Sequence, residues 1–158
     1  MKILIVGYFT EISKSNIVRH FPKDWDIVIV PPGEEMLHHI EDCQVIIPEH
    51  IKVDHSLLSI AKKLKLVQTG AGFDNVDIDA CTELGIWVAN AAGVNAQAVA
   101  EHVMALILSY YKNIPFLDAF MKNRLDQNQL DYTGSELKGK TIGIIGLGAI
   151  GRKVAEFC

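Results

Sequence analysis

Apolar residues in the first 90 positions gather in short clusters rich in Val and Ile, separated by longer mixed stretches. Short apolar runs that end at glycine or proline are typical of buried strands. Such runs predict strands at residues 2–6, 25–30, 43–47, 64–68 and 86–89. The stretches between them predict helices at residues 11–21, 34–40, 54–64 and 77–84. Strands that alternate with helices predict an α/β fold, a parallel sheet with helices on both faces.

A long helix is predicted at residues 96–112, and it is apolar nearly all round. A helix without a polar face is typically buried between two domains or two subunits. Glu101 and His102 lie inside it, and we expect a buried hydrogen-bonded pair or an interface contact. Beyond Pro115, which interrupts the helical pattern, residues 118–135 are polar and predict an irregular crossing segment.

A glycine motif follows the apolar run at residues 141–145, which predicts a buried strand. Gly146, Gly148 and Gly151 form G-x-G-x-x-G, and a helix is expected from Ala149. Strand, glycine motif and helix in this order predict a dinucleotide site. The first glycine permits the turn, the second admits a pyrophosphate, and the third lets helix and strand pack closely. The alternative is a glycine-rich turn without a ligand.

Two loops are expected at the carboxyl edge of the first sheet, where ligands gather in such folds. In residues 68–77, glycines flank Ala71, so that Ala71 and Gly72 can offer backbone N–H groups to a carboxylate. Asp74, Asn75 and Asp77 are expected to serve as turn and cap residues. The second loop, residues 90–95, ends at Asn95, which either caps the long helix or binds a substrate oxygen.

Charge and cysteine content narrow the classes of function. The net charge of −4 and the absence of a basic block argue against nucleic-acid and membrane-surface binding. The apolar run after Lys2 is too short for a signal peptide, and no run is long enough to span a membrane. Cys43, Cys81 and Cys158 are widely spaced, which favours free thiols and a cytoplasmic location.

Three stretches together resemble the D-isomer-specific 2-hydroxyacid dehydrogenase family, which includes phosphoglycerate dehydrogenases. They are residues 69–77 (TGAGFDNVD), 90–102 (NAAGVNAQAVAEH) and 137–151 (LKGKTIGIIGLGAIG). The resemblance implies a flavodoxin-like substrate-binding domain at residues 1–95. It also implies an interdomain helix, a crossing segment and the incomplete start of a Rossmann NAD-binding domain at residues 96–158.

The resemblance implies a role for each of these sites. Ala71, Gly72 and Asn95 would bind a small 2-hydroxy or 2-oxo acid, with Ala71 also near the nicotinamide. The cofactor would contact the motif, whose members are Gly146, Gly148, Ala149, Ile150 and Gly151. The reaction would be hydride transfer with NAD, and NADP stays open because the discriminating residues lie outside this chain. A homodimer is expected, and no metal.

The resemblance assigns no catalytic residue to this chain. The family's catalytic arginine and its glutamate–histidine pair lie downstream of the glycine motif, and the sequence ends at Cys158. We therefore expect a truncated chain that is inactive by itself. The alternative is a non-enzymatic binding or dimerisation module derived from the family. An FMN carrier is less favoured, because residues 7–10 lack the run of hydroxyls and glycines that would hold its phosphate.

Overall fold

The computed structural model describes residues 1–123 and 133–158. The chain divides into two compact units, an N-terminal unit, Met1–Ala92, and a C-terminal unit, Gly93–Cys158.

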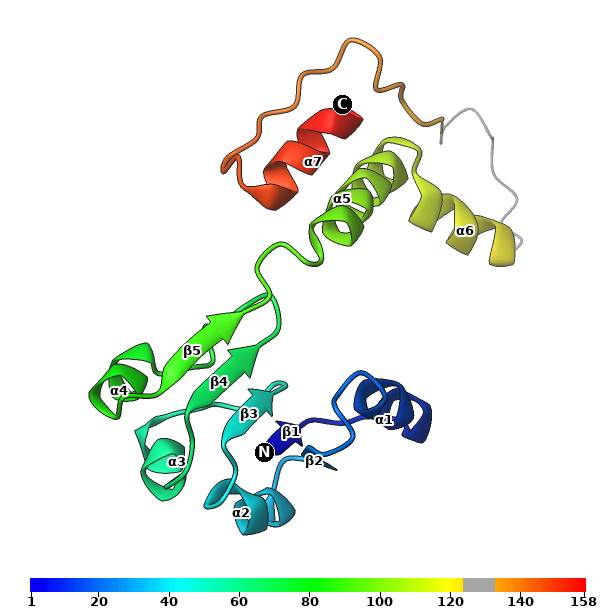
Figure 1. Cartoon of the computed structure of the whole chain (residues 1–158). Helices are drawn as coiled ribbons and strands as arrows, with labels where there is room; N and C mark the ends of the chain where they lie inside the picture. Colours follow the sequence, from blue (N-terminus) through cyan, green and yellow to red (C-terminus); the bar gives the residue numbers. More distant parts are fainter. Residues whose placement is uncertain (124–132) are drawn as a thin grey trace. The chain divides into compact units, whose positions relative to one another are not determined.

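The N-terminal unit is built on a five-stranded parallel sheet (Figure 1). Its strands are β1 (Lys2–Val6), β2 (Asp26–Val30), β3 (Val45–Pro48), β4 (Leu66–Thr69) and β5 (Trp87–Asn90). The strand order is β2-β1-β3-β4-β5, which is the flavodoxin-like order with its switch point between β1 and β3. The predicted α/β class, with a flavodoxin-like sheet, is confirmed.

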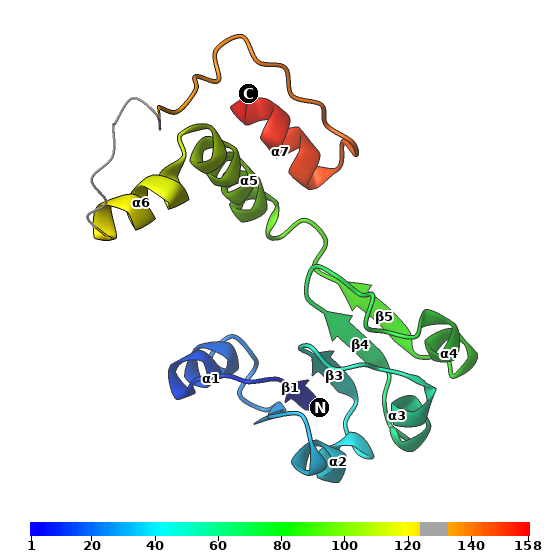
Figure 2. The ribbon, with the colours of Figure 1, turned by 180° about the vertical axis from the view of Figure 1, so that it is seen from behind.

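Helices cover both faces of this sheet (Figure 2). They are α1 (Glu11–Val18), α2 (Glu34–Ile40), α3 (His55–Ile60) and α4 (Ile78–Glu83). On one face Leu4, Ile46 and Val67 form a fully buried core with residues of α2, α3 and α4. On the other face Ile3 and Ile5 pack with Ile17 of α1 and its neighbours. Alternate residues of β1, β2, β3 and β4 therefore face two separate cores, which explains their apolar runs, whereas Trp87 of the edge strand β5 is exposed.

The ends of these helices follow local chemistry. Asp54 accepts a hydrogen bond from the Leu57 N–H at the start of α3, and Asp77 accepts one from the Ala80 N–H at the start of α4. Gly85, just after α4, has a φ of +67°, as the predicted glycine stop requires. Two helices are shorter than predicted, since α1 ends at Val18 and α3 at Ile60.

The C-terminal unit contains α5 (Ala96–Tyr111), α6 (Ile114–Lys122) and α7 (Ala149–Phe157). Helices α5 and α7 pack against each other, with Ala100 and Val154 buried. The prediction of an irregular segment from residue 118 was wrong as far as Lys122. Pro115 lies in the first turn of α6, where its missing N–H costs no hydrogen bond. Residues 124–132 of the predicted segment lie outside the described residues.

Two further predictions for the C-terminal unit were wrong. Residues 141–145 form no strand, and Ile145 is fully exposed. The described residues provide no neighbouring strand for this run, and a strand needs a partner for its backbone groups. Glu101 and His102 are not a buried pair, because both are exposed and Glu101 accepts its hydrogen bond from Gln97, one turn earlier. The alternative, an interface contact, stays a prediction.

Candidate functional site

The loop after β4 is held open at the carboxyl edge of the N-terminal sheet. The Asn90 side chain, at the end of β5, donates a 2.9 Å hydrogen bond from Nδ2 to the Ala71 carbonyl oxygen. The Ala91 N–H donates to the Gly70 carbonyl oxygen, also at 2.9 Å. These two bonds occupy the carbonyl groups of Gly70 and Ala71.

The far end of this loop is fixed as well. Asn75 donates from Nδ2 to the Ile51 carbonyl oxygen at 2.8 Å, and Val76 forms a parallel bridge with Val53. Asp77 caps α4, as predicted. Asn75 and Asp77 thus have structural roles, while the Asp74 carboxylate lies beside Gly72, where a Cβ would be 3.0 Å from its Oδ1.

The N–H groups of Ala71 and Gly72 are available for a ligand. Among the described residues, neither N–H donates a hydrogen bond, and Gly72 is exposed. Two adjacent free N–H groups on an anchored loop suit a carboxylate, because its two oxygens can accept from both.

The glycine motif in the C-terminal unit has the geometry of a turn into a helix. Gly146 has a φ of +92°, a conformation that favours glycine. Gly148 is the N-cap residue of α7 and has no side chain to cap it. A Cβ on Gly151 would lie 2.2 Å from the Gly146 carbonyl oxygen, so the turn and the helix touch at this glycine.

The first turn of α7 therefore presents uncapped N–H groups. The N–H groups of Ala149 and Ile150 have no intrahelical acceptor, since they lie in the first turn. The positive end of the helix dipole adds to their attraction for an anion. This arrangement suits a diphosphate.

The loop before α5 lies next to this turn. A Cβ on Gly93, whose φ is +77°, would be 3.3 Å from the Ala149 Cβ. Asn95 is the N-cap residue of α5, but its side chain makes no cap hydrogen bond and is exposed. The capping role considered for the Asn95 side chain was therefore wrong. Ala71 and Gly72 belong to the N-terminal unit, whereas Asn95 and the glycine motif belong to the C-terminal unit.

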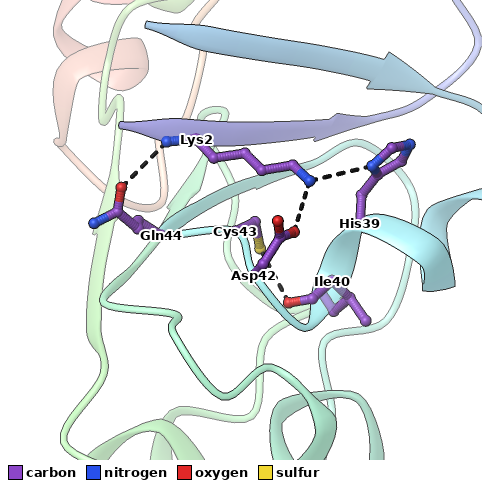
Figure 3. Close-up of polar contacts among 6 residues, drawn as sticks. All are labelled: Lys2, His39, Ile40, Asp42, Cys43 and Gln44. Carbon is purple, nitrogen blue, oxygen red and sulfur yellow. Dashed lines mark hydrogen bonds and ion pairs between the residues drawn. The ribbon is translucent and has the colours of Figure 1, made fainter.

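A polar cluster at the opposite edge of the N-terminal sheet has a structural role (Figure 3). The Lys2 ammonium donates to Asp42 Oδ1 at 2.6 Å and to His39 Nδ1 at 3.3 Å, and the Lys2 N–H donates to Gln44 Oε1. The hydrogen bond from Lys2 holds the pKa of the Asp42 carboxyl below its usual range. These contacts connect the start of β1 to His39, near the end of α2, and to Asp42 and Gln44, which precede β3.

The buried cysteines do not suit nucleophilic chemistry. Burial raises the pKa of the Cys43 thiol to about 11, and its Sγ donates to the Ile40 carbonyl oxygen. Burial also raises the pKa of Cys81. A thiol with a raised pKa is protonated at neutral pH and reacts slowly.

The described residues lack two other features, a metal-binding cluster and a membrane-spanning helix. Residues 1–123 and 133–158 hold no group of three or more His, Cys, Asp and Glu side chains arranged to bind a metal ion. In the same ranges no helix has the length and apolar character that a membrane span requires.

Two residues at the sheet edge were missed as site candidates. Asn90 was recognised only as part of a loop, and Glu49 was not considered. Glu49 directly follows β3, and its Oε1 would lie 3.9 Å from a Cβ on Gly70. Asn90 is the last residue of β5, and Glu49 directly follows β3. This position at the carboxyl edge of the sheet was the signal that could have identified them.

Comparisons with known proteins identify the family of this chain. The family model described as "D-isomer specific 2-hydroxyacid dehydrogenase, catalytic domain" matches residues 7–151. A D-3-phosphoglycerate dehydrogenase from Archaeoglobus fulgidus is 39% identical over 163 aligned positions, which cover 100% of this chain and 30% of that enzyme.

Solved structures show the same fold. The NAD-dependent formate dehydrogenase from Staphylococcus aureus in complex with NAD has a TM-score of 0.82 and 29% identity, over 99% of this chain and 53% of that chain. An acyclic imino acid reductase in complex with NADPH and D-Arg has a TM-score of 0.80 and 28% identity, over 99% and 52%. This chain thus spans about half of each solved relative and less than a third of the archaeal enzyme. This chain belongs to the D-isomer-specific 2-hydroxyacid dehydrogenase family, because nearly the whole chain, residues 7–151, matches that family's catalytic-domain model.

Proposed function

We propose that this chain is part of an NAD-dependent oxidoreductase that transfers a hydride between NAD(H) and a small 2-hydroxy or 2-oxo acid. The observation that carries the proposal is the anchored loop after β4, with the free N–H groups of Ala71 and Gly72. These groups would hold the substrate carboxylate and so orient carbon 2. Asn95 would contribute its amide to the substrate, and Ala71 would also contact the nicotinamide.

The cofactor would bind at the turn into α7. Gly146 and Gly151 shape the turn, Gly148 leaves room for the pyrophosphate, and the N–H groups of Ala149 and Ile150 would bind it. The nicotinamide, once bound, supplies or accepts the hydride. NAD is the cofactor we propose, although solved relatives carry NAD in one case and NADPH in another.

The proposal assigns residues 1–95 to substrate binding and residues 96–158 to the interdomain helix and the start of the cofactor domain. In this proposal the family's catalytic arginine and its glutamate–histidine pair are assigned to no residue of this chain. We therefore expect residues 1–158 alone to lack turnover, and we propose a cytoplasmic location for the enzyme.

A second candidate function is a non-enzymatic dimerisation module. It is favoured by the exposed apolar side chains of α5 and α6, such as Leu106, Tyr110 and Met121. The same surface would serve a homodimeric enzyme, so an oligomer alone does not distinguish the two functions. Binding of nicotinamide cofactor does, because the module needs none.

The test is NADH oxidation by the intact gene product with glyoxylate, hydroxypyruvate and pyruvate, repeated with NADPH. Asn90→Ala removes the hydrogen bond to the Ala71 carbonyl oxygen, which is worth about 1 kcal/mol. We expect KM for the 2-oxo acid to rise about fivefold, with KM for NADH unchanged. Asn16→Ala, on the exposed surface of α1, is the control. An intact product that neither binds NADH nor reduces any 2-oxo acid would refute the enzyme proposal.

A further inference from the structure

Glu49 occupies the switch point of the N-terminal sheet. It directly follows β3, which lies between β1 and β4 in the sheet. A Cβ on Gly7, after β1, would be 2.8 Å from the Glu49 Cβ, and a Cβ on Gly70, after β4, would be 3.9 Å from its Oε1. The Glu49 side chain therefore lies across the ends of three adjacent strands, next to the loop that contains Ala71 and Gly72.

The Glu49 carboxylate is half-buried and has no partner. Among the described residues no side chain or N–H group donates a hydrogen bond to it, and no cation lies within ion-pair distance. Its oxygens are open to water, because the described residues hold no buried side-chain oxygen that lacks a hydrogen-bond partner. A ligand that brings a donor to this point can therefore reach the carboxylate and bond to it.

The cations near this edge of the sheet are already paired. Lys14 lines an open cavity of about 520 Å³ beside Gly7 and forms an ion pair with Glu11 at 2.9 Å. Lys52 lies 4.0 Å from Asp54. All residues of the N-terminal unit are described, and none of its strand-end loops contains an arginine. Lys14 and Lys52 are thus already engaged and are not free to pair with a second anionic group on a substrate at this edge.

We propose that Glu49 selects the substrate by the tail of the acid, which is the group on its third carbon. Glu49 favours a 2-oxo acid whose tail is a hydroxyl or ammonium donor and rejects one whose tail is a second anion. This inference rests on the proposed function, since it assumes that Ala71 and Gly72 hold the substrate carboxylate. Glu49 would then accept a hydrogen bond from the tail. A carboxylate or phosphate at the same point would instead repel Glu49. At an assumed separation of roughly 6 Å and an effective dielectric constant of about 40, between those of a protein surface and bulk water, the repulsion disfavours it about tenfold.

The test compares substrates that differ only in the tail. Glyoxylate has none, hydroxypyruvate ends in a hydroxyl, and oxaloacetate ends in a carboxylate. Using the intact gene product with saturating NADH at pH 8, where an ordinary histidine is uncharged, kcat/KM is measured for all three. Glu49→Gln keeps the size of the side chain and removes its charge. Glu83→Gln, on the exposed end of α4 at the other edge of the sheet, is the charge-matched control.

We expect Glu49→Gln to raise kcat/KM for oxaloacetate about tenfold, with glyoxylate changed less than twofold. Glu83→Gln should leave the ratio of hydroxypyruvate to oxaloacetate unchanged. Glu49→Ala also removes the charge and should raise kcat/KM for oxaloacetate relative to glyoxylate, which tests the idea if Glu49→Gln folds poorly. Reduction of glyoxylate with a ratio that Glu49→Gln does not alter would overturn this inference alone. Failure of the wild-type protein to reduce all three acids would instead overturn the proposed function.

Discussion

Adding a methyl group at Gly151 tests whether the third glycine of the motif is required for close packing, apart from any effect on cofactor binding. In Gly151→Ala the new Cβ would lie 2.2 Å from the Gly146 carbonyl oxygen and 3.3 Å from the Ile144 Cγ2. Ordinary contacts of this kind begin at 3.4 Å, so the backbone of the turn and α7 must separate by about 1 Å. The neighbour is backbone, which cannot rotate away. We expect a cost near the upper end of overpacking, about 3 kcal/mol.

The matched control is Gly148→Ala. Nothing lies within 4 Å of a Cβ at Gly148, and its φ of −78° is open to alanine. The folded chain should therefore tolerate this change. If Gly148 makes room for the pyrophosphate, however, the methyl group should weaken NADH binding roughly tenfold.

Hydrogen exchange and cofactor titration together measure both effects. A loss of about 3 kcal/mol should accelerate exchange of the α7 amides about a hundredfold in Gly151→Ala, and hardly at all in Gly148→Ala. NADH affinity should fall in both variants. Equal exchange rates in the two variants would refute the reasoning that the third glycine is required for close packing.

Two further predictions concern the N-terminal unit. Asp77→Ala removes the cap of α4 and should lower the free energy of unfolding by about 1 kcal/mol, measured by urea denaturation, whereas Asp79→Ala in the same helix should cost less. The pKa of Asp42 is lowered by Lys2, so its contribution to stability is present above the unfolded-state pKa and is lost as the pH falls through the folded-state value. Asp42→Asn should therefore lower the melting temperature at pH 7 but not at pH 2, and an equal loss at both values would show that the ion pair is irrelevant.

The sequence predicted the N-terminal unit well because its signals are local. Each strand is an apolar run, and each end is marked by chemistry such as the Asp77 cap or Gly85. The Ala71 and Gly72 loop was also predictable, because glycines after a strand indicate free backbone groups. The hydrogen bond from Asn90 to the Ala71 carbonyl oxygen was not, since it joins residues 19 positions apart through strand pairing.

The failures arose where a residue's state depends on what packs against it. Glu101 and His102 lie on an apolar helix, so burial was expected, yet both are exposed and Glu101 pairs within its own helix. The run at residues 141–145 has strong strand propensity but no partner strand among the described residues. Glu49 was missed because a lone glutamate after a strand carries no local sign that it lies beside Gly70.

The unpaired run at residues 141–145 has a further consequence for anyone who handles this protein. It contains three isoleucines and no charge, and most of its residues are exposed. Exposed backbone groups beside β-branched side chains are a template for intermolecular strand pairing, the route by which soluble chains aggregate. Whenever this run lacks a partner strand, at synthesis or after partial unfolding, it is the segment from which self-association should start. The same apolar character that suits it to the centre of a sheet makes it prone to aggregate when it is exposed.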